Sequence, residues 1–270
     1  KKGATHLFSD EKMREIVSLL QQQVIKITPG DSTANTIAGI SNFGGKTAYL
    51  GKAGNDDHGR LFVNSLVDSQ VDSKVILNDN LTGKVISLVT PDSERTMIVY
   101  LGAAKELDPQ DVNEQDIKDS QFLHLTGYQL EEPRLKEASL RAMKIAKENC
   151  VKISIDLADA ELVKRNLEFL KEIVKEYAHV VFANEEEAVA FTGKEPREAL
   201  EEISRMSCIS VVKVGKCGSF IRADGTTHEI ACEVAKAVDT TGAGDAYAAG
   251  VLFGLARGFT HDRSGRIGAY

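Results

Sequence analysis

The second half of the chain alternates short β-rich runs with longer amphipathic segments, and this alternation constrains the fold more than any other feature. The β-rich runs are 122–125, 152–156, 180–183 and 209–214, and the helical patterns between them are 133–148, 160–177, 185–192 and 197–206. Strands separated by helices pair in parallel, and the helices then cover both faces of the sheet. The sequence therefore predicts a three-layer α/β/α fold with a mostly parallel central sheet.

The first half is less regular, and it contains a hairpin that does not fit the alternation. Residues 85–90 and 96–101 are rich in β-branched side chains and flank a turn sequence at 91–94. We interpret this pair as a small β lid or an edge appendage. Further expected helices are 10–22, 32–41, 56–68 and 243–257, further expected strands are 24–28 and 47–52, and a second hairpin is expected at 219–222 and 228–231.

Charge and composition exclude several classes of protein. The formal net charge is −7, and the basic residues are scattered among acidic ones, so a nucleic-acid partner is not expected. No apolar run approaches the ~18–20 residues that a membrane span needs. The four cysteines show no C-x-x-C spacing, and we interpret them as reduced, packed residues of a cytoplasmic protein.

Residues that directly follow predicted strands carry most of the chemical information. In open α/β sheets, ligands bind outside the carboxyl ends of the strands. Polar and glycine-rich stretches occur at these places, namely 30–31, 51–54, 127–128, 156, 184, 215–218 and 239–245.

The stretch 239–245 reads Asp-Thr-Thr-Gly-Ala-Gly-Asp and precedes a small-residue helix pattern. Glycines at a helix start leave backbone N–H groups open to an anion, and the helix dipole adds to their attraction. Asp245 is placed to accept a proton from a hydroxyl aligned with a phosphate. Taken alone, a glycine-rich turn capped by an aspartate remains an open alternative. A Rossmann fingerprint that starts at Gly242 would need a third glycine where Tyr247 stands. Elsewhere in the chain, a Walker loop that ends in Gly45-Lys-Thr47 would need a glycine where Ile40 stands.

Two motifs carry a family resemblance. The residues from Asp239 to Leu252 resemble the C-terminal signature of the ribokinase-like (PfkB) carbohydrate kinase family, and Gly30-Asp-Ser-Thr-Ala-Asn35 resembles its N-terminal signature. The resemblance runs in the same order along nearly all of the chain, and it is nearest to bacterial fructokinase-like and adenosine-kinase-like members. It implies a ribokinase-like fold and an ATP-dependent kinase that phosphorylates a hydroxymethyl group of a sugar or nucleoside.

The resemblance also implies the catalytic machinery. Asp245 corresponds to the general base, and the backbone amides of Gly242, Ala243 and Gly244 correspond to the anion hole. The motif Asn184-Glu-Glu-Glu187 matches the family's Asn-x-x-Glu, which acts on Mg²⁺ and the phosphates. An alternative explanation of 184–187 needs no ligand, because acidic residues at the start of a helix are stabilised by the helix dipole.

The resemblance assigns the nucleotide to residues near the carboxyl ends of the later strands, namely Asn184, Lys213, Gly215, Gly218 and Thr240. The family often has threonine where Lys213 stands, and usually a second glycine where Asp31 stands. Magnesium is expected to be held by Asn184 and Glu187 together with substrate oxygens, as is usual for this ion.

The acceptor side rests on the N-terminal signature and the hairpin. The residues expected to contact the acceptor are Gly30, Asp31, Asn35, Gly44, Gly45 and Arg95. Asp31 has an equally good reading as the N-cap of the helix that begins at Ser32. Residues 1–270 are expected to form one kinase domain truncated at both termini, with a lid made of about 1–9 and 74–102.

Two rival functions stay open at this point. A ribokinase-like kinase of a vitamin-type alcohol shares the fold, and the residues at Asp31 and Lys213 leave room for a non-catalytic sugar or nucleotide sensor. The sequence does not choose among fructose, ribose and adenosine. An exposed lid strand could also pair with a second copy of the chain in a homodimer.

Overall fold

The computed structural model describes residues 5–20, 26–89, 95–232 and 242–270. The chain divides into two compact units. The first comprises Lys1–Gly30, Ala48–Asp68 and Asp72–Leu107, and the second comprises Asp31–Thr47, Ser69–Val71 and Asp108–Tyr270.

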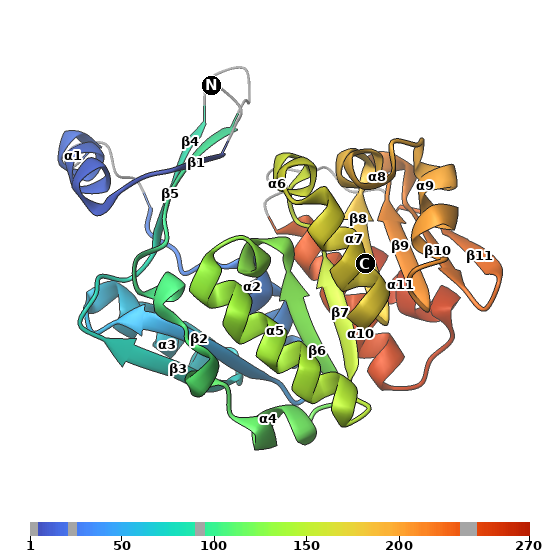
Figure 1. Cartoon of the computed structure of the whole chain (residues 1–270), viewed down its shortest axis with the longest axis horizontal. Helices are drawn as coiled ribbons and strands as arrows, with labels where there is room; N and C mark the ends of the chain where they lie inside the picture. Colours follow the sequence, from blue (N-terminus) through green and yellow to red (C-terminus); the bar gives the residue numbers. More distant parts are fainter. Residues whose placement is uncertain (1–4, 21–25, 90–94, 233–241) are drawn as a thin grey trace. The chain divides into compact units, whose positions relative to one another are not determined.

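Within its described residues, the second unit is built on a six-stranded sheet with the order β11-β10-β9-β8-β7-β6 (Figure 1). The strands are β6 (Phe122–Thr126), β7 (Lys152–Asp156), β8 (Val180–Asn184), β9 (Ile209–Lys213), β10 (Ser219–Ala223) and β11 (Thr226–Ile230). The neighbours from β6 to β9 pair in parallel, whereas β10 is antiparallel to both β9 and β11. The mostly parallel sheet predicted from the alternation is confirmed.

Helices of the second unit pack on both faces of this sheet. They are α2 (Ser32–Asn42), α4 (Glu114–Lys118), α5 (Pro133–Glu148), α6 (Ala160–Arg165), α7 (Leu167–Tyr177), α8 (Glu185–Thr192), α9 (Pro196–Ile203), α10 (Ala243–Ala256) and α11 (His261–Ala269), with short 3-10 turns at Pro109–Asp111, Gly127–Leu130 and Gly215–Cys217. On one face Val251 of α10 packs with Phe182 and Val211. Ser210, on the opposite face of β9, donates to the Leu200 carbonyl of α9. Residues of alternating direction along one strand thus contact different helix layers.

Helices α2 and α10 approach each other closely in this unit. A Cβ built on Gly39 would lie 2.7 Å from Cβ of Ala249, so only glycine allows the observed approach. Thr36 is buried in the same interface and its hydroxyl donates to the carbonyl oxygen of Asp245 at 3.3 Å. The start of α10 is therefore held against the first turns of α2.

The first unit contains two small sheets and two helices among its described residues. Strands β1 (Thr5–Leu7), β5 (Arg95–Tyr100) and β4 (Lys84–Val89) form one sheet, and β2 (Ala48–Gly54) pairs in parallel with β3 (Asp72–Asn78) in the other. The helices are α1 (Asp10–Leu20) and α3 (Asp57–Asp68), and a 3-10 turn spans Gly102–Glu106. The predicted hairpin is present as β4 and β5. The predicted lid range 74–102 spans parts of both sheets.

Three predicted features differ from the structure. No strand forms at 26–28, the described part of the expected strand 24–28, where the residues are exposed and precede Pro29, which has no N–H to donate to a neighbouring strand. The expected helix 160–177 is two helices, because Asn166 leaves helical geometry and its side-chain amide donates to the Leu162 carbonyl. The strand β3 has no counterpart among the predicted elements.

The predictions about the cysteines and about membrane-spanning segments can also be compared with the structure. Cys150, Cys208, Cys217 and Cys232 are all free, as predicted, but they are exposed, so the prediction that they are packed was wrong. Cys150 has a positive φ of 57°, which places it in a turn after α5 instead of inside it. No helix in the described part of the chain combines the length and apolar character needed to cross a bilayer.

Candidate functional site

Asp245 occupies the first turn of α10, and two side chains from α2 fix its carboxylate. Ser32 Oγ donates to Oδ1 at 2.6 Å, and Asn35 Nδ2 donates to Oδ2 at 2.9 Å. Gly242 precedes the helix with a φ of +75°, a conformation that favours glycine. Among the described residues, no side chain caps this helix start, so its first backbone N–H groups can bind a ligand or water. The predicted base and anion hole therefore share one helix turn.

The local sequence explains why α2 presents Ser32 and Asn35 together. Asp31 caps the helix, since its carboxylate accepts from the Ala34 N–H at 2.8 Å. Ser32 and Asn35 are three residues apart and therefore lie on the same side of the helix. Of the two interpretations of Asp31, the structure shows the N-cap.

Burial and hydrogen bonding act in opposite directions on Asp245. Burial raises the pKa of this carboxyl above its ordinary value, while the hydrogen bonds from Ser32 and Asn35 lower it. The two donors thus favour the ionised form that a general base requires.

Lys213 and Asp156 form a buried ion pair at the carboxyl edge of the sheet. They end β9 and β7, and Lys213 Nζ lies 2.9 Å from Asp156 Oδ2. Their side chains are 16% and 9% exposed. The pKa of Lys213 is raised, because the nearby carboxylates Asp156 and Glu187 outweigh the opposing effect of burial.

Asn184 and Glu187 form a reciprocal capping box at the start of α8. Asn184 Oδ1 accepts from the Glu187 N–H at 2.8 Å, and Glu187 accepts from the backbone N–H and the side-chain amide of Asn184 at 2.8 and 2.7 Å. Glu187 is only 3% exposed. Burial, followed by the charge of Asp156, raises the pKa of Glu187 to about 7.

The oxygen ligands at this edge suit a divalent cation of the magnesium type. Besides the paired Asp156 and Lys213, Glu187 and Asp245 supply two carboxylates, and this excess of negative charge favours a bound cation. Within the described residues, no group of three or more His, Cys, Asp or Glu side chains is close enough together to hold a metal alone. A magnesium ion here would need phosphate oxygens as further ligands.

The glycine loop after β9 lies next to the start of α8. Gly215 has a φ of +54°, and a Cβ built on it would lie 4.0 Å from the carboxylate of Glu185. Gly218 has a φ of +92°, and a Cβ there would lie 2.0 Å from the Ile230 carbonyl oxygen, so glycine is required for close approach of β11. Gly218 therefore has a structural reason to be glycine besides the predicted nucleotide contact.

The structure gives Gly44 and Gly45 a local role at the end of a helix. They follow the C-terminal end of α2, whereas Asn35 is near its start, and an 11-residue helix is roughly 16 Å long. The N–H groups of Gly44 and Gly45 instead bind the carbonyls of Ser41 and Ile40, as in a helix C-cap. A small residue after a helix also serves to end it. The predicted approach of the two glycines to the acceptor stays a prediction.

Three further residues were predicted for the site. Gly30 belongs to the first unit, as does Arg95, which begins β5 and whose side chain lies outside the described part. Thr240, with the rest of 239–241, also lies outside the described residues.

Ser32 and Asp156 are the two site residues to which the sequence analysis assigned no role. Each of them has a sequence feature that could have identified it. Ser32 sits inside the Gly30–Asn35 motif, and Asp156 ends a predicted buried strand, where a carboxylate is costly unless it is paired. What the sequence did not show is that Lys213, two strands away, is the partner.

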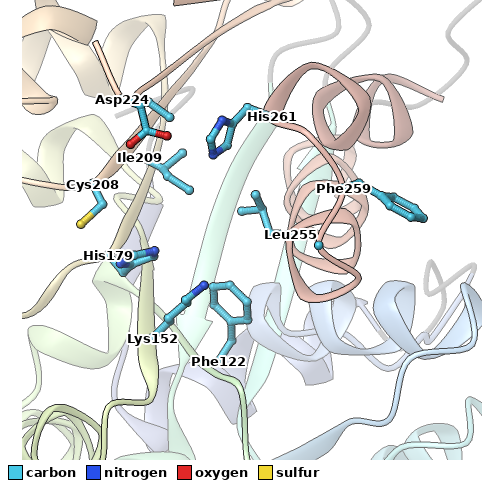
Figure 2. Close-up of a pocket in the computed structure, with 11 residues that line it drawn as sticks. Phe122, Lys152, His179, Cys208, Ile209, Asp224, Leu255, Phe259 and His261 are labelled. Atoms are coloured by element: carbon cyan, nitrogen blue, oxygen red, sulfur yellow. The ribbon is translucent and has the colours of Figure 1, made fainter. Parts of the chain in front are cut away.

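A cavity lies at the opposite, amino edge of the same sheet (Figure 2). It is a cavity of about 250 Å³, and Lys152, His179 and Phe122 gather on one side of it. The residues that line it are Phe122, Lys152, His179, Cys208, Ile209, Ala223, Asp224, Leu255, Gly258, Phe259 and His261. Burial and the charge of Lys152 lower the pKa of His179, so its neutral form is favoured. No motif of the sequence falls on this cavity.

Comparisons with known proteins place this chain in a family. The adenosine kinase of Sinorhizobium meliloti is 31% identical, with a TM-score of 0.92 over all of this chain and 83% of that one. The 5-dehydro-2-deoxygluconokinase of Listeria monocytogenes is 28% identical over 85% of this chain and 74% of its own length. An Arabidopsis thaliana protein named "Probable fructokinase-5" is 27% identical over 93% of this chain and 81% of its own length.

The fold and these relatives define the class as a ribokinase-like sugar or nucleoside kinase. The model of the pfkB family carbohydrate kinases matches residues 7–270, and the chain belongs to that family. The family, the fold class and the enzyme class predicted from the two signatures are confirmed.

Proposed function

We propose that this protein transfers the γ-phosphoryl group of ATP to a hydroxymethyl group of a sugar or nucleoside, with Asp245 as the general base. The observation that carries the proposal is the carboxylate of Asp245, fixed by Ser32 and Asn35 in the first turn of a helix with uncapped N–H groups. A base and an anion-binding helix start in one turn meet the two main requirements of phosphoryl transfer.

In the proposed reaction Asp245 accepts the proton of the acceptor hydroxyl while that oxygen bonds to the γ-phosphorus. The bond from phosphorus to the oxygen that bridges it to ADP breaks, and ADP leaves with the bonding electrons. The N–H groups of Gly242, Ala243 and Gly244 stabilise the negative charge on the transferring group, because they lie at the N-terminal end of α10, where the helix dipole is positive.

On the donor side, we place the nucleotide phosphates beside Asn184, Lys213 and the loop Gly215–Gly218. The buried carboxylate of Glu187, with Asn184, would hold magnesium, which neutralises phosphate charge when bound. Asn184 fixes both Glu187 oxygens through its backbone N–H and its side-chain amide.

On the acceptor side, Asn35 is the residue that we expect to contact a substrate hydroxyl. Its amide already reaches the base, so one side chain can align the base and the hydroxyl. The names of the relatives motivate fructose, 5-dehydro-2-deoxygluconate and adenosine as candidate acceptors. The lid role of 1–9 and 74–102, Thr240 and Arg95 stay predictions.

The test is a panel of acceptors assayed with ATP and Mg²⁺, using the wild type and Asp245→Asn. We expect one acceptor of the sugar or nucleoside class to be phosphorylated, and the variant to lose about 10²- to 10⁴-fold in kcat with ATP affinity retained. A vitamin-type hydroxymethyl heterocycle in the panel covers the same fold acting on another alcohol. Binding without turnover across the panel would indicate a sensor, and near-normal turnover by the variant would exclude Asp245 as the base.

A further inference from the structure

Two independent sources of positive charge meet at the start of α10. One is the helix itself, whose first N–H groups are capped by no side chain of the described residues. The other is Lys213, because a Cβ built on Gly244 would lie 3.2 Å from its ammonium nitrogen. A cation is normally unfavourable at the N-terminal end of a helix, where the dipole repels it. Such an arrangement is expected where an anion is to be bound between the two.

Asp156 makes this arrangement tolerable in the unliganded protein. It holds Lys213 Nζ at 2.9 Å through Oδ2, while its Oδ1 accepts from the Ala158 N–H at 3.0 Å. Asp156 is at the fixed end of a buried strand and is 6% exposed, so it has little freedom to follow a moving partner. The lysine is therefore anchored at one side and faces Gly244 at the other.

A stabilising role alone does not explain the pair. Replacing a buried ion pair with apolar residues is often neutral or favourable for stability, because desolvation offsets the attraction. The pair also lies at the carboxyl edge of the sheet, where the carboxylates of Asp245 and Glu187 attract the charge of Lys213. Among the described residues, Asp156 is the hydrogen-bond partner of Lys213, and an ammonium group has three protons to donate.

We propose that Lys213 is a catalytic residue that adds a full positive charge to the phosphate site at the start of α10, and that Asp156 is the positioning residue that holds it there. This rests on the proposed function, which assigns the phosphate to that helix start. Lys213 donates to the oxygens of the transferring group as charge develops on them, next to the amides of Gly242–Gly244. Asp156 acts only through Lys213 and does not contact the phosphate.

The experiment measures kcat and the KM for ATP in Lys213→Met, Asp156→Asn and the double variant, with thermal unfolding as a check on folding. Lys213→Met is expected to lower kcat by about 10²-fold, as for the loss of one donor to a transition-state anion. Lys213→Arg should restore part of the rate, because it keeps the charge. Lys194→Met is the matched control, since Lys194 pairs with Glu202 at 2.8 Å on the exterior of the same unit, and its kcat should not change.

The double variant separates positioning from an independent role. If Asp156 acts only through Lys213, Asp156→Asn lowers kcat by itself but adds nothing to Lys213→Met. Losses that multiply in the double variant would overturn the positioning role of Asp156. Should Lys213→Met unfold, addition of an alkylammonium salt to Lys213→Ala should raise its kcat, and no rescue would count against the proposal.

Failure of this proposal can be told apart from failure of the proposed function. If Lys213→Met keeps wild-type kcat while Asp245→Asn loses it, the lysine is not catalytic but the general base stands. If both variants turn over normally, the phosphate is not transferred at this helix start.

Discussion

The two edges of the six-stranded sheet carry similar residue types but arrange them differently. At the carboxyl edge, carboxylates that are buried bind other polar side chains, as in the pair Asp156–Lys213 and the box Asn184–Glu187. At the amino edge, Lys152 and Cys208 are exposed, and Lys152 lies over the Phe122 ring (Figure 2). Each edge has a lysine at a strand terminus, since Lys213 is the last residue of β9 and Lys152 is the first residue of β7. Residue type alone therefore does not distinguish the two edges.

The two edges differ in how far their charged groups are removed from water and in how many elements contribute those groups. A charge that is removed from water is costly unless partners compensate for it, so a buried group of charges must be built by several elements together. At the carboxyl edge β7, β8, β9, α2 and α10 all contribute. The amino edge shows a hollow without such a network among its described residues. Perturbed, converging groups are the better indicator of a functional site than an open cavity.

The largest effect that tests this contrast is expected from Glu187→Gln. Gln keeps the size of the side chain and one oxygen for the Asn184 N–H, but it removes the buried negative charge. We expect the magnesium concentration for half-maximal activity to rise roughly 10- to 100-fold, as for loss of a metal-supporting group. The measurement is a magnesium titration of the initial rate at fixed ATP.

Glu186→Gln is the control for this substitution. Glu186 is adjacent and exposed, and it carries the same charge on the same helix turn. Equal magnesium requirements in the two variants would show that the charge of α8, and not the buried position of Glu187, determines the effect.

A smaller and pH-dependent effect is expected from Ser32→Ala. Burial raises the pKa of Asp245 and the hydroxyl of Ser32 lowers it, so removal of the hydroxyl raises that pKa further. A base with a higher pKa is protonated over a wider acidic range. Activity should therefore fall roughly tenfold near pH 6 and less near pH 8.5, in keeping with a hydrogen bond to a charged group.

The pH profile of kcat/KM for the acceptor measures this shift. The acidic limb of Ser32→Ala should lie at higher pH than that of the wild type, while Ser32→Thr, which keeps a hydroxyl, should restore much of it. An equal loss at every pH would instead indicate that Ser32 only positions Asp245 and does not affect its protonation.

The sequence predicted the carboxyl edge well where a motif lies on one continuous segment. The alternation of 122–214 gave the parallel strands, and the glycines before Asp245 gave the helix start, because both depend on local periodicity and backbone freedom. The ion pair Asp156–Lys213 could not be predicted, since it joins side chains 57 residues apart across two neighbouring strand pairs. Gly44 and Gly45 also have a local role that the sequence analysis did not assign, since their backbone N–H groups end α2.

The smallest effect is expected at the amino edge, from Lys152→Met. Lys152 begins the strand that Asp156 ends, so the same substitution can be compared at two edges of one sheet with Lys213→Met. Because Lys152 is exposed, its loss should change the free energy of unfolding by no more than about 0.5 kcal/mol. Its kcat and KM for ATP should stay within about twofold of the wild type, since no buried partner loses its compensation. Steady-state kinetics and urea unfolding of the two variants, side by side, measure both quantities. A loss of kcat in Lys152→Met that approaches the loss in Lys213→Met would mean that charge at either edge supports the reaction, and burial would then no longer explain why the carboxyl edge is the site.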